Sequence, residues 1–310
     1  MENIFAIVVS WNGLKHDWIA KCLASLRDSD TAIKTILIDN ASTDDTVAFV
    51  RQNFPEVQLI ASEENLGFGA ANNLGFEKAL EQGADYFFLL NQDARVDKDC
   101  VRRLVEQSKK NPGYGILSPI HLNGKGDEVE EFFCSRISPG FCPRLYSDFV
   151  LNRVEDRIYE SGFINAACWL ISRACLKKVG GFSPVFYHYG EDDNFFHRMK
   201  HKQFKLGIYP KTFIYHDKEN NKNPVLFNKN LNRRTVLMIL SEPDRQYDFA
   251  HYLRHFRKEF LKRKLTGDKS GAAEALGNLN YFKKERAWIE STRAETMTDR
   301  SFLFLDFKED

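Results

Sequence analysis

Short apolar runs alternate with amphipathic stretches along the first 110 residues of the chain. Four of the runs have the length and composition of strands that are buried on both faces. Each is followed by a stretch with helical spacing, and Gly83 is typical of the position just after a helix. Four strand–helix units in a row predict an α/β fold with a doubly wound, mostly parallel sheet. The predicted strands are residues 4–9, 34–39, 57–61 and 86–90, and the predicted helices are residues 18–26, 69–82, 97–110 and one that begins near Ser42 with Asp45 in a capping box.

Polar residues follow all four predicted strands. In a doubly wound sheet, ligands bind beyond the carboxyl ends of the strands, which meet at one edge. Each loop alone also fits ordinary turn formers, but four polar loops at one edge favour a ligand crevice. The chain has no P-loop, and no dinucleotide-binding G-x-G-x-x-G follows the first strand. The four loops are residues 10–13, 39–42, 64–67 and 91–93.

The second half of the chain has a less regular pattern. Turn signals and short strand candidates over residues 114–157 predict an irregular, partly antiparallel region. Residues 164–171 are apolar, and residues 192–203 have helical spacing with Phe195 and Met199 on the inward face. Residues 221–310 are predicted to be mainly helical.

Composition narrows the class of protein. The 310 residues are 43% hydrophobic and 28% charged, as in soluble globular proteins, and 44 basic against 43 acidic residues give no bias towards nucleic acid. The six cysteines show no C-x-x-C spacing, and Cys22 and Cys100 fall in apolar helical patterns, as reduced thiols of cytosolic proteins do. No apolar stretch approaches the roughly 20 residues that cross a bilayer, and the opening run is too short for a signal peptide. We therefore expect a cytoplasmic protein, or one held at a membrane only by its surface.

Five segments, in this order and spacing, resemble family-2 glycosyltransferases, and they lie within residues 4–217. The resemblance implies a GT-A fold, an inverting mechanism and a nucleoside-diphosphate sugar donor held with Mg²⁺ or Mn²⁺. The Leu-Asn-x-Asp form of the fourth segment is similar to that of rhamnosyl- and galactofuranosyl-type transferases, which build bacterial surface polysaccharide. The segments are Val-Val-Ser-Trp-Asn-Gly at 8–13, Ile-Asp-Asn-Ala-Ser-Thr-Asp at 38–44, Asn-Leu-Gly-Phe-Gly-Ala-Ala-Asn-Asn at 65–73, Leu-Asn-Gln-Asp at 90–93, and Gly-Gly-Phe followed after seven residues by Gly-Glu-Asp-Asp at 180–193.

The resemblance also implies a division of the chain. Residues 1–220 are expected to form the GT-A catalytic domain, with a nucleotide-sugar half at 1–112 and an acceptor half at 113–220. Residues 221–310 form the helical C-terminal extension of this interpretation.

In the family, the acid that ends the second strand faces the nucleobase, and Asp39 holds that place here. A carboxylate only accepts hydrogen bonds, so it suits the N3–H of uracil or thymine and disfavours cytosine. The expected donor is therefore a UDP- or dTDP-sugar. The alternative role for Asp39 is to cap the helix expected near Ser42. The other residues expected to bind the nucleotide-sugar are Asn12, Asn65, Gly67, Asn72, Asn73 and Asn91.

The resemblance assigns the metal to Asp93 and His216. Asp93 takes the last position of the family's D-x-D motif, and Asn91 takes the first, where it can hydrogen-bond the ribose. Having Asn rather than Asp removes one charge, so metal binding should be weaker without the donor diphosphate. One carboxylate with substrate phosphates still suits Mg²⁺. A lone histidine at a strand end also fits a structural role, and His197 with His201 fits a solvated helix face better than a zinc site.

Inversion requires one base to take the proton of the acceptor hydroxyl as it attacks the anomeric carbon. The resemblance assigns this role to Asp192, at a helix start that favours its ionised form. Glu191 and Asp193 are expected to orient the acceptor or to cap the helix, and Trp169 is expected to contact the acceptor. That acceptor is predicted to be a glycan or a polyprenyl-linked glycan.

Residues 249–265 have aromatic and aliphatic side chains at helical spacing, with six basic residues between them and only Glu259 opposing. Such a helix could lie on an anionic membrane, where lipid-linked acceptors are found. The alternative is a helix that packs on the catalytic domain and leaves its basic face solvated.

Two other classes of protein remain open at this point. A nucleotidyltransferase of related topology needs a Gly-rich, basic loop after the first strand, and residues 10–13 contain no basic residue. A non-catalytic glycan-binding protein with the same fold would not need Asp93 and Asp192, and both are present.

Overall fold

The computed structural model describes residues 2–217 and 231–308. The chain divides into two compact units, of which one contains residues 2–217 with 300–308 and the other residues 231–299. The boundary predicted at residues 220–221 lies outside the described residues.

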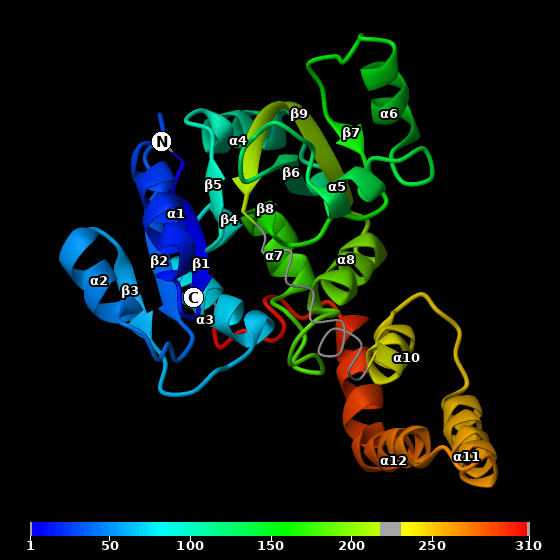
Figure 1. The fold of residues 1–310 in the computed structure, drawn as a ribbon. Coiled ribbons are helices and arrows are strands. Elements are labelled where there is room, and N and C mark those ends of the chain that lie inside the picture. Colours follow the sequence, from blue (N-terminus) through cyan, green and yellow to red (C-terminus); the bar gives the residue numbers. More distant parts are fainter. Residues whose placement is uncertain (1, 218–230, 309–310) are drawn as a thin grey trace. The chain divides into compact units, whose positions relative to one another are not determined.

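The first four strands form the parallel half of one large sheet (Figure 1). β1 lies between β2 and β4, and β3 pairs with the outer side of β2. The register sets Ser10 beside Asp39 and Val9 beside Asn91, so the carboxyl ends of these strands share one edge. The strands are β1 (Ile4–Ser10), β2 (Lys34–Asp39), β3 (Gln58–Ala61) and β4 (Tyr86–Asn91).

The other half of the sheet is mixed. β8 lies antiparallel between β4 and β6, and β6 pairs in parallel with β9. Both β5 and β7 pair antiparallel with β9. β5 pairs Ala94 with His216, which brings the residue after Asp93 beside the end of β9. These strands are β5 (Ala94–Val96), β6 (Tyr114–Asn123), β7 (Tyr159–Glu160), β8 (Cys168–Ser172) and β9 (Lys205–His216).

Alternate side chains of the central strands enter two separate apolar cores, one on each face of the sheet. Phe5 and Ile7 pack in the first core, while Ala6 and Val8 pack in the second. Side chains of α3, α7 and α8 line the first core, and side chains of α1, α2 and α4 line the second. The helices of this unit are α1 (Trp18–Arg27, preceded by η1, Lys15–Asp17), α2 (Thr46–Asn53), α3 (Phe68–Glu81), α4 (Cys100–Lys110), α5 (Glu131–Arg136), α6 (Pro143–Val150), α7 (Arg173–Val179) and α8 (Glu191–His201).

One predicted helix start was wrong. α2 begins at Thr46 rather than near Ser42, and its N-cap residue Asp45 makes no side-chain capping bond. The reason is that Asp44 accepts hydrogen bonds from the backbone nitrogen (3.1 Å) and hydroxyl of Thr46, while the Ser42 hydroxyl donates to Asp39 (2.5 Å). Residues 42–45 therefore form a turn held by side chains instead of a first helical turn.

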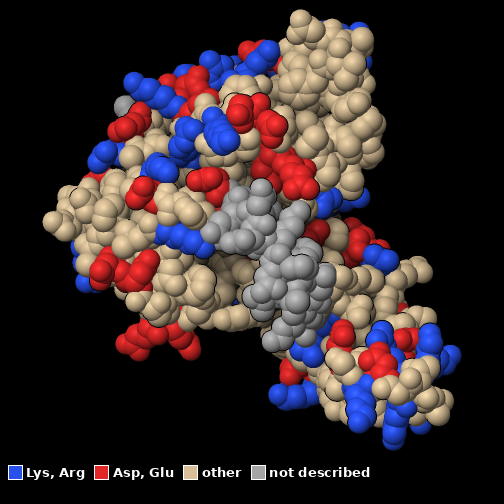
Figure 2. Space-filling view, viewed as in Figure 1, with Lys and Arg blue, Asp and Glu red and all other residues tan. Residues whose placement is uncertain are grey.

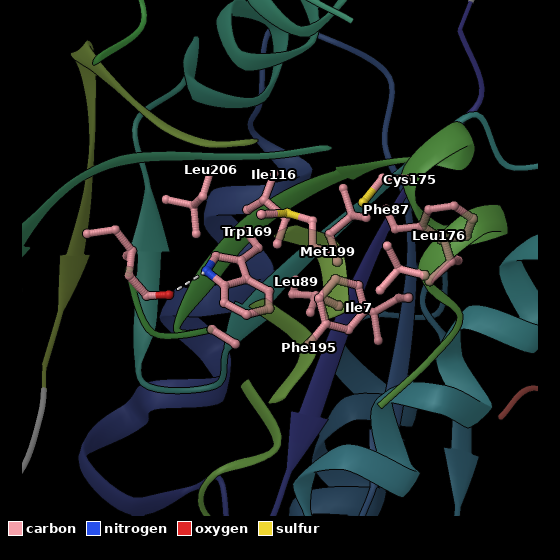
Figure 3. Packing of buried hydrophobic residues seen from close by; sticks show 14 of the residues in the cluster. Ile7, Phe87, Leu89, Ile116, Trp169, Cys175, Leu176, Phe195, Met199 and Leu206 are labelled. Carbon is pink, nitrogen blue, oxygen red and sulfur yellow. Dashed lines mark hydrogen bonds between the residues drawn. The ribbon is translucent and has the colours of Figure 1, made fainter. Parts of the chain in front are cut away.

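Trp169 lies in the first core and is fully buried (Figure 3). Its Nε1 donates to the carbonyl of Ile164 (3.1 Å), and its ring contacts Phe182 and Phe195 with centroid separations of 6.4 and 5.7 Å. The ring has no surface to offer to an acceptor, which corrects the acceptor contact predicted for Trp169. Replacing such a side chain with alanine typically costs about 3–5 kcal/mol of folding free energy.

Residues 300–308, grouped with the helical extension in the sequence interpretation, pack on the first unit. Phe302, Leu303 and Leu305 are buried there, and the Leu303 carbonyl accepts from the backbone nitrogen of Gly181 (2.8 Å). A Cβ on Gly180, whose φ is +82°, would lie 2.2 Å from that carbonyl oxygen. The Gly-Gly pair therefore makes room for this segment.

The second unit consists of helices in its described residues. Phe249 and Phe256 of α11 are buried and pack on the Phe282 ring of α12, with centroids 6.3 and 5.5 Å apart. Part of the aromatic stripe that could have entered a membrane is therefore used for packing. No helix in the described part of the chain is long and apolar enough to cross a bilayer. The helices are α10 (Leu231–Ser241), α11 (Phe249–Leu265) and α12 (Lys269–Thr296).

Candidate active site

Gln92 joins the loops that follow β1 and β4. Its Oε1 accepts from the Ser10 hydroxyl (2.8 Å) and from the backbone nitrogen of Trp11 (3.1 Å), and its Nε2 donates to the Trp11 carbonyl (3.0 Å). Asn12 joins the first loop to the second in the same way, because its Oδ1 accepts from the backbone nitrogen of Thr43 (2.8 Å). The side-chain amides of Gln92 and Asn12 therefore link the loops at the carboxyl ends of β1, β2 and β4.

Asn40 and Asn65 link the loops that follow β2 and β3. The Asn40 Nδ2 donates to Asn65 Oδ1 (3.0 Å), which also accepts from the backbone nitrogen of Gly67 (2.9 Å). Tyr187 crosses this loop and donates from its hydroxyl to the Asn65 carbonyl (3.0 Å). Gly67 has a φ of +79°, and a Cβ there would lie 2.2 Å from the Tyr187 carbonyl oxygen. Only glycine allows this approach, which brings the segment before α8 to the donor half.

Asp39 is buried at the end of β2. Its two oxygens accept from the backbone nitrogen (3.0 Å) and the hydroxyl (2.5 Å) of Ser42. The helix-capping alternative does not hold, because α2 begins four residues beyond Ser42. The carboxylate closes the turn after β2, and its contact with a nucleobase stays a prediction.

The side chains of Asn72 and Asn73 hydrogen-bond to backbone groups of the protein. The Asn72 Nδ2 donates to the Phe68 carbonyl within α3 (2.9 Å). The Asn73 amide accepts from the backbone nitrogen of Phe182 (2.7 Å) and donates to the carbonyls of Phe182 (2.9 Å) and Phe304 (3.3 Å). Nucleotide contacts by these two residues stay predictions, and their hydrogen bonds give both a structural role.

The structure brings Asp93 and His216 together, although 123 positions separate them. Asp93 Oδ1 lies 3.2 Å from Nε2 of the buried His216, and the Asp93 carbonyl accepts from the backbone nitrogen of Asp217 (2.8 Å). Asp93 also lines a cavity of about 210 Å³ with Trp18 and Arg95.

A carboxylate oxygen and a histidine nitrogen facing each other fit Mn²⁺ or Mg²⁺. In the described part of the chain no third His, Cys, Asp or Glu completes a metal-binding group. The remaining ligands would therefore have to come from the donor phosphates and water.

Asp192 lies in the first turn of α8. Burial raises the pKa of its carboxyl group, while hydrogen bonds from the backbone nitrogens of Asp193 (2.9 Å) and Ala166 (3.4 Å) and the charge of Arg136 act in the opposite direction. Burial has the larger effect, so the pKa is raised despite the helix N-terminus. A carboxyl group with a raised pKa is a better proton acceptor than an ordinary aspartate.

The neighbouring positions differ in exposure. Glu191 is buried, Asp193 is half-buried, and both carboxylates lie in the first turn of α8, where they complement the helix dipole. The backbone nitrogen of Asn91 donates to the Ala167 carbonyl (2.9 Å), which joins the end of β4 to the start of β8. Acceptor contacts by Glu191 and Asp193 and a ribose contact by Asn91 stay predictions.

Sequence reasoning assigned no role to Gln92 or Arg136. Gln92 lies inside the Leu-Asn-Gln-Asp segment, so a signal was present. Arg136 lies in the region predicted to be irregular, where only its spacing from aromatic residues such as Phe132 and Phe141 marks it.

Residues 5–180 match the family model described as "Glycosyl transferase family 2", which is more than half of the chain. The chain belongs to glycosyl transferase family 2. This membership supports transfer of a glycosyl group over the nucleotidyltransferase and glycan-binding alternatives.

Two relatives of this glycosyltransferase have names that describe transfer of a rhamnosyl group. It is 25% identical over 240 residues to N-acetylglucosaminyl-diphospho-decaprenol L-rhamnosyltransferase of Mycobacterium tuberculosis, which covers 70% of this chain and 77% of the relative. It is 27% identical over 123 residues to dTDP-rhamnosyl transferase RfbF of Shigella flexneri, which covers 39% of this chain and 40% of that protein.

The crystal structure of GalNAc-T7 with UDP, GalNAc and Mn²⁺ has the same fold. It superposes with a TM-score of 0.55 at 15% identity, over 78% of this chain and 51% of that one, so the glycosyltransferase spans about half of it. The fold is GT-A, as the sequence predicted.

Proposed function

We propose that this glycosyltransferase is inverting and metal-dependent, and that it moves a deoxyhexosyl group from a dTDP- or UDP-sugar to a lipid-linked glycan. The observation that carries the proposal is the pairing of Asp93 with His216 at the strand edge that also holds Asp39. The names of the two relatives support a rhamnosyl group as the sugar, and the mycobacterial relative supports an acceptor joined to a lipid by a diphosphate.

Asp39 is the residue that we propose reads the base. Its hydrogen bonds with Ser42 use one acceptor position on each oxygen, and a carboxylate has about four such positions. Capacity remains for the N3–H of thymine or uracil. Cytosine would present an acceptor to an acceptor, which disfavours it.

Asp192 is the base that we propose for the transfer. The acceptor oxygen attacks the anomeric carbon, its proton passes to an Asp192 oxygen, and the bond from the anomeric carbon to the diphosphate oxygen breaks. The electron pair of that bond leaves with the diphosphate. A divalent metal held by Asp93 and His216 would stabilise the charge on this leaving group.

The donor assignment can be tested with nucleotide-sugars alone. The wild-type protein with Mn²⁺ should bind dTDP-rhamnose or a UDP-sugar more tightly than a CDP-sugar in calorimetry. Asp39→Asn adds a donor to the site, so the ratio of affinities between thymine or uracil nucleotides and cytidine nucleotides should shrink. An unchanged ratio would show that Asp39 does not read the base, and failure to transfer rhamnose to any N-acetylglucosaminyl lipid would overturn the proposed function.

A further inference from the structure

Arg136, the last residue of α5, lies among three aromatic rings. The central carbon of its guanidinium is 4.5 Å from the ring centroid of Phe132, 5.0 Å from that of Phe141 and 5.1 Å from that of Phe163. Phe132 is one helical turn before Arg136, and the adjacent Phe133 is fully buried, which fixes α5 against the core. Flat guanidinium groups stack well on aromatic faces, so the aromatic cage orients this cation without neutralising it.

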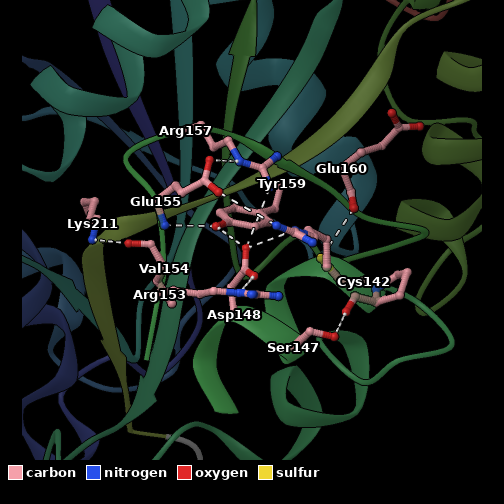
Figure 4. Close-up of polar contacts among 12 residues, drawn as sticks. Cys142, Ser147, Asp148, Arg153, Val154, Glu155, Arg157, Tyr159, Glu160 and Lys211 are labelled. Carbon is pink, nitrogen blue, oxygen red and sulfur yellow. Dashed lines mark hydrogen bonds and ion pairs between the residues drawn. The ribbon is translucent and has the colours of Figure 1, made fainter. Parts of the chain in front are cut away.

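One hydrogen-bonding group of Arg136 is unused in the described part of the chain. Its Nε is buried and has no hydrogen-bond partner there. Other arginines that follow in the chain are different. Arg144 pairs with the buried Asp148. Figure 4 shows Arg153 paired with Asp148 and Arg157 paired with Glu155. The N–H donors of a guanidinium lie in a fixed planar fork, and this geometry fits the oxygens of a phosphate group.

The cage adjoins the helix that carries the candidate base. Phe163 packs edge to face on Phe196 of α8, with centroids 5.7 Å apart. Asp192 precedes Phe196 by four residues on α8, so the two side chains share one face of that helix. The charge of Arg136 also acts on the Asp192 carboxyl group. An anion bound by Arg136 would therefore belong to the acceptor, whose hydroxyl Asp192 deprotonates.

An exposed apolar surface continues from the cage. Phe141, one wall of the cage, is 42% exposed and lies directly before α6. On α6, Tyr146, Phe149 and Val150 are exposed at the spacing of one helix face, and Figure 2 shows few charged side chains over this helix. The α6 residue Asp148 is buried and bound by Arg153 (3.0 Å) and Tyr159 (2.9 Å), which holds the apolar face outward.

We propose that Arg136 binds a phosphate of a lipid-linked acceptor, and that Phe141 with the exposed face of α6 binds the hydrocarbon that follows this phosphate. The proposal rests on the proposed function and adds the residues that would select an amphiphilic phosphate-bearing acceptor. Phosphate and hydrocarbon are adjacent in such an acceptor, as the cage and the apolar face are on this surface.

The phosphate contact can be tested with two synthetic acceptors that have the same short alkyl chain. One carries N-acetylglucosamine through a diphosphate, and the other carries it directly as an alkyl glycoside. Arg136→Gln should raise KM for the diphosphate acceptor by roughly tenfold or more, the value of a lost charge-assisted hydrogen bond. It should leave the donor KM and KM for the alkyl glycoside near wild type. Because the charge of Arg136 also acts on Asp192, any change in kcat should be the same for both acceptors. Arg136→Lys, which keeps the charge but not the fork, should fall between the two.

Lys205→Gln is the control, because it removes one positive charge from an exposed side chain that pairs with Glu160 (2.7 Å), outside α5 and α6, and should not change KM for either acceptor. Thermal unfolding of each variant establishes that it folds. An equal rise in KM for both acceptors, or no rise in KM for the diphosphate acceptor, would overturn the proposal. If the wild type transfers to neither acceptor, the proposed function fails. Calorimetry with the diphosphate acceptor then still tests whether Arg136 binds its phosphate. Equal affinity for wild type and Arg136→Gln would then refute it.

The hydrocarbon contact has its own measurement. Lengthening the alkyl chain of the diphosphate acceptor should lower KM for the wild type. In Phe149→Ser with Val150→Ser this dependence on chain length should largely disappear, while the difference between diphosphate and glycoside acceptors should persist. A chain-length dependence that is the same in wild type and variant would show that the lipid does not lie on α6.

Discussion

Asp192 shows how the surroundings of one half-buried carboxyl group can favour proton transfer. A helix N-terminus and two backbone donors favour its charged form, but burial favours the neutral form more strongly and raises its pKa. The carboxylate therefore accepts a proton more readily than an exposed aspartate does.

We predict that Asp192→Asn lowers transfer by at least ~10²-fold, the usual value of a lost general base, with donor affinity retained. Because the wild-type base works only when deprotonated and its pKa is raised, kcat/KM should fall with decreasing pH at a value above the ordinary 3.8 of aspartate. Stopped assays of transfer across pH measure this acid limb. Transfer near the wild-type rate in the variant would move the role to Glu191 or Asp193.

Asp93 and His216 give a second prediction at this scale. Asp93→Ala should abolish turnover and also the gain in nucleotide affinity that Mn²⁺ provides, because only one protein ligand would remain beside the phosphates. His216→Ala should weaken the same gain without removing the carboxylate. Calorimetric titration of dTDP or UDP with and without Mn²⁺ separates metal-assisted from metal-independent binding. An unchanged difference in Asp93→Ala would remove the metal assignment.

The sequence could place Asp39 and Asp93 because Asp39 ends, and Asp93 follows, a strand whose apolar pattern is unambiguous, whereas their roles stay predictions. Asp39 and Asp93 lie at strand ends that must meet in a parallel sheet, so their proximity to one edge followed from topology. The hydrogen bonds of Asn73 to Phe182 and Phe304 could not be predicted, because they join segments 109 and 231 positions away. From sequence alone, the side-chain amide of an asparagine can hydrogen-bond a ligand or a carbonyl group of the protein equally well.

At the scale of elements, the sequence pattern did not predict the helices α5 and α6. The sequence predicted an irregular region over residues 114–157, because turn residues interrupt any periodic pattern there. The helices form in a tertiary setting that supplies what the local sequence lacks. Asp148 accepts from Arg153 and Tyr159 and pairs with Arg144 (3.3 Å) and Arg157 (3.8 Å). No helix propensity encodes such a cluster.

We predict that Asp148→Asn opens the segment around α6. Burial alone would raise the pKa of the Asp148 carboxyl group, but hydrogen bonds from Tyr159 and Arg153 and the charge of Arg144 more than offset this and lower it. The stabilising contribution of a group with a lowered folded pKa is present above the unfolded value and is lost as pH falls through the folded value. In the wild type, loss should therefore begin only below about pH 3.8.

Hydrogen exchange of residues 143–157 measures this opening. Asp148→Asn should exchange faster at neutral pH, where the wild type is protected. Tyr159→Phe, which removes one hydrogen bond worth about 1 kcal/mol, should have a smaller effect. If Asp148→Asn exchanges like the wild type at neutral pH, the carboxylate does not hold α6 in place.

At the scale of the whole molecule, the end of the chain completes the catalytic unit. Residues 300–308 return to α3, α7 and the Gly180–Gly181 pair, so the first unit is built from two separate parts of the sequence. The apolar residues at 302–305 mark this segment as one that packs, but nothing in the sequence says against which surface. A glycine pair with one positive φ fits a ligand and a returning chain equally well from sequence alone.

The helix α11 has the basic residues that were predicted for a membrane-binding helix, but part of its aromatic stripe is buried. Phe249 and Phe256 pack on Phe282, so the side chains predicted to insert into a membrane include two that face the interior of the second unit. Arg254 pairs with Asp248 (2.7 Å) and Arg263 with Asp268 (2.8 Å), which reduces the free charge further. In the described residues, the basic side chains of α11 without an ion pair are Arg257, Lys258, Lys262 and Lys264.

We therefore predict that any contact of α11 with an anionic membrane is electrostatic. Four such cations at about 1 kcal/mol each give roughly 4 kcal/mol near an anionic surface, and salt should screen most of it. Sedimentation with anionic vesicles at low and high salt measures this. Arg257→Glu with Lys258→Glu and Lys262→Glu should release the protein and leave transfer to a short soluble acceptor intact, whereas the charge-conserving Arg257→Lys should bind like the wild type. Wild-type protein that ignores such vesicles at low salt, or binding that survives high salt, would contradict an electrostatic contact.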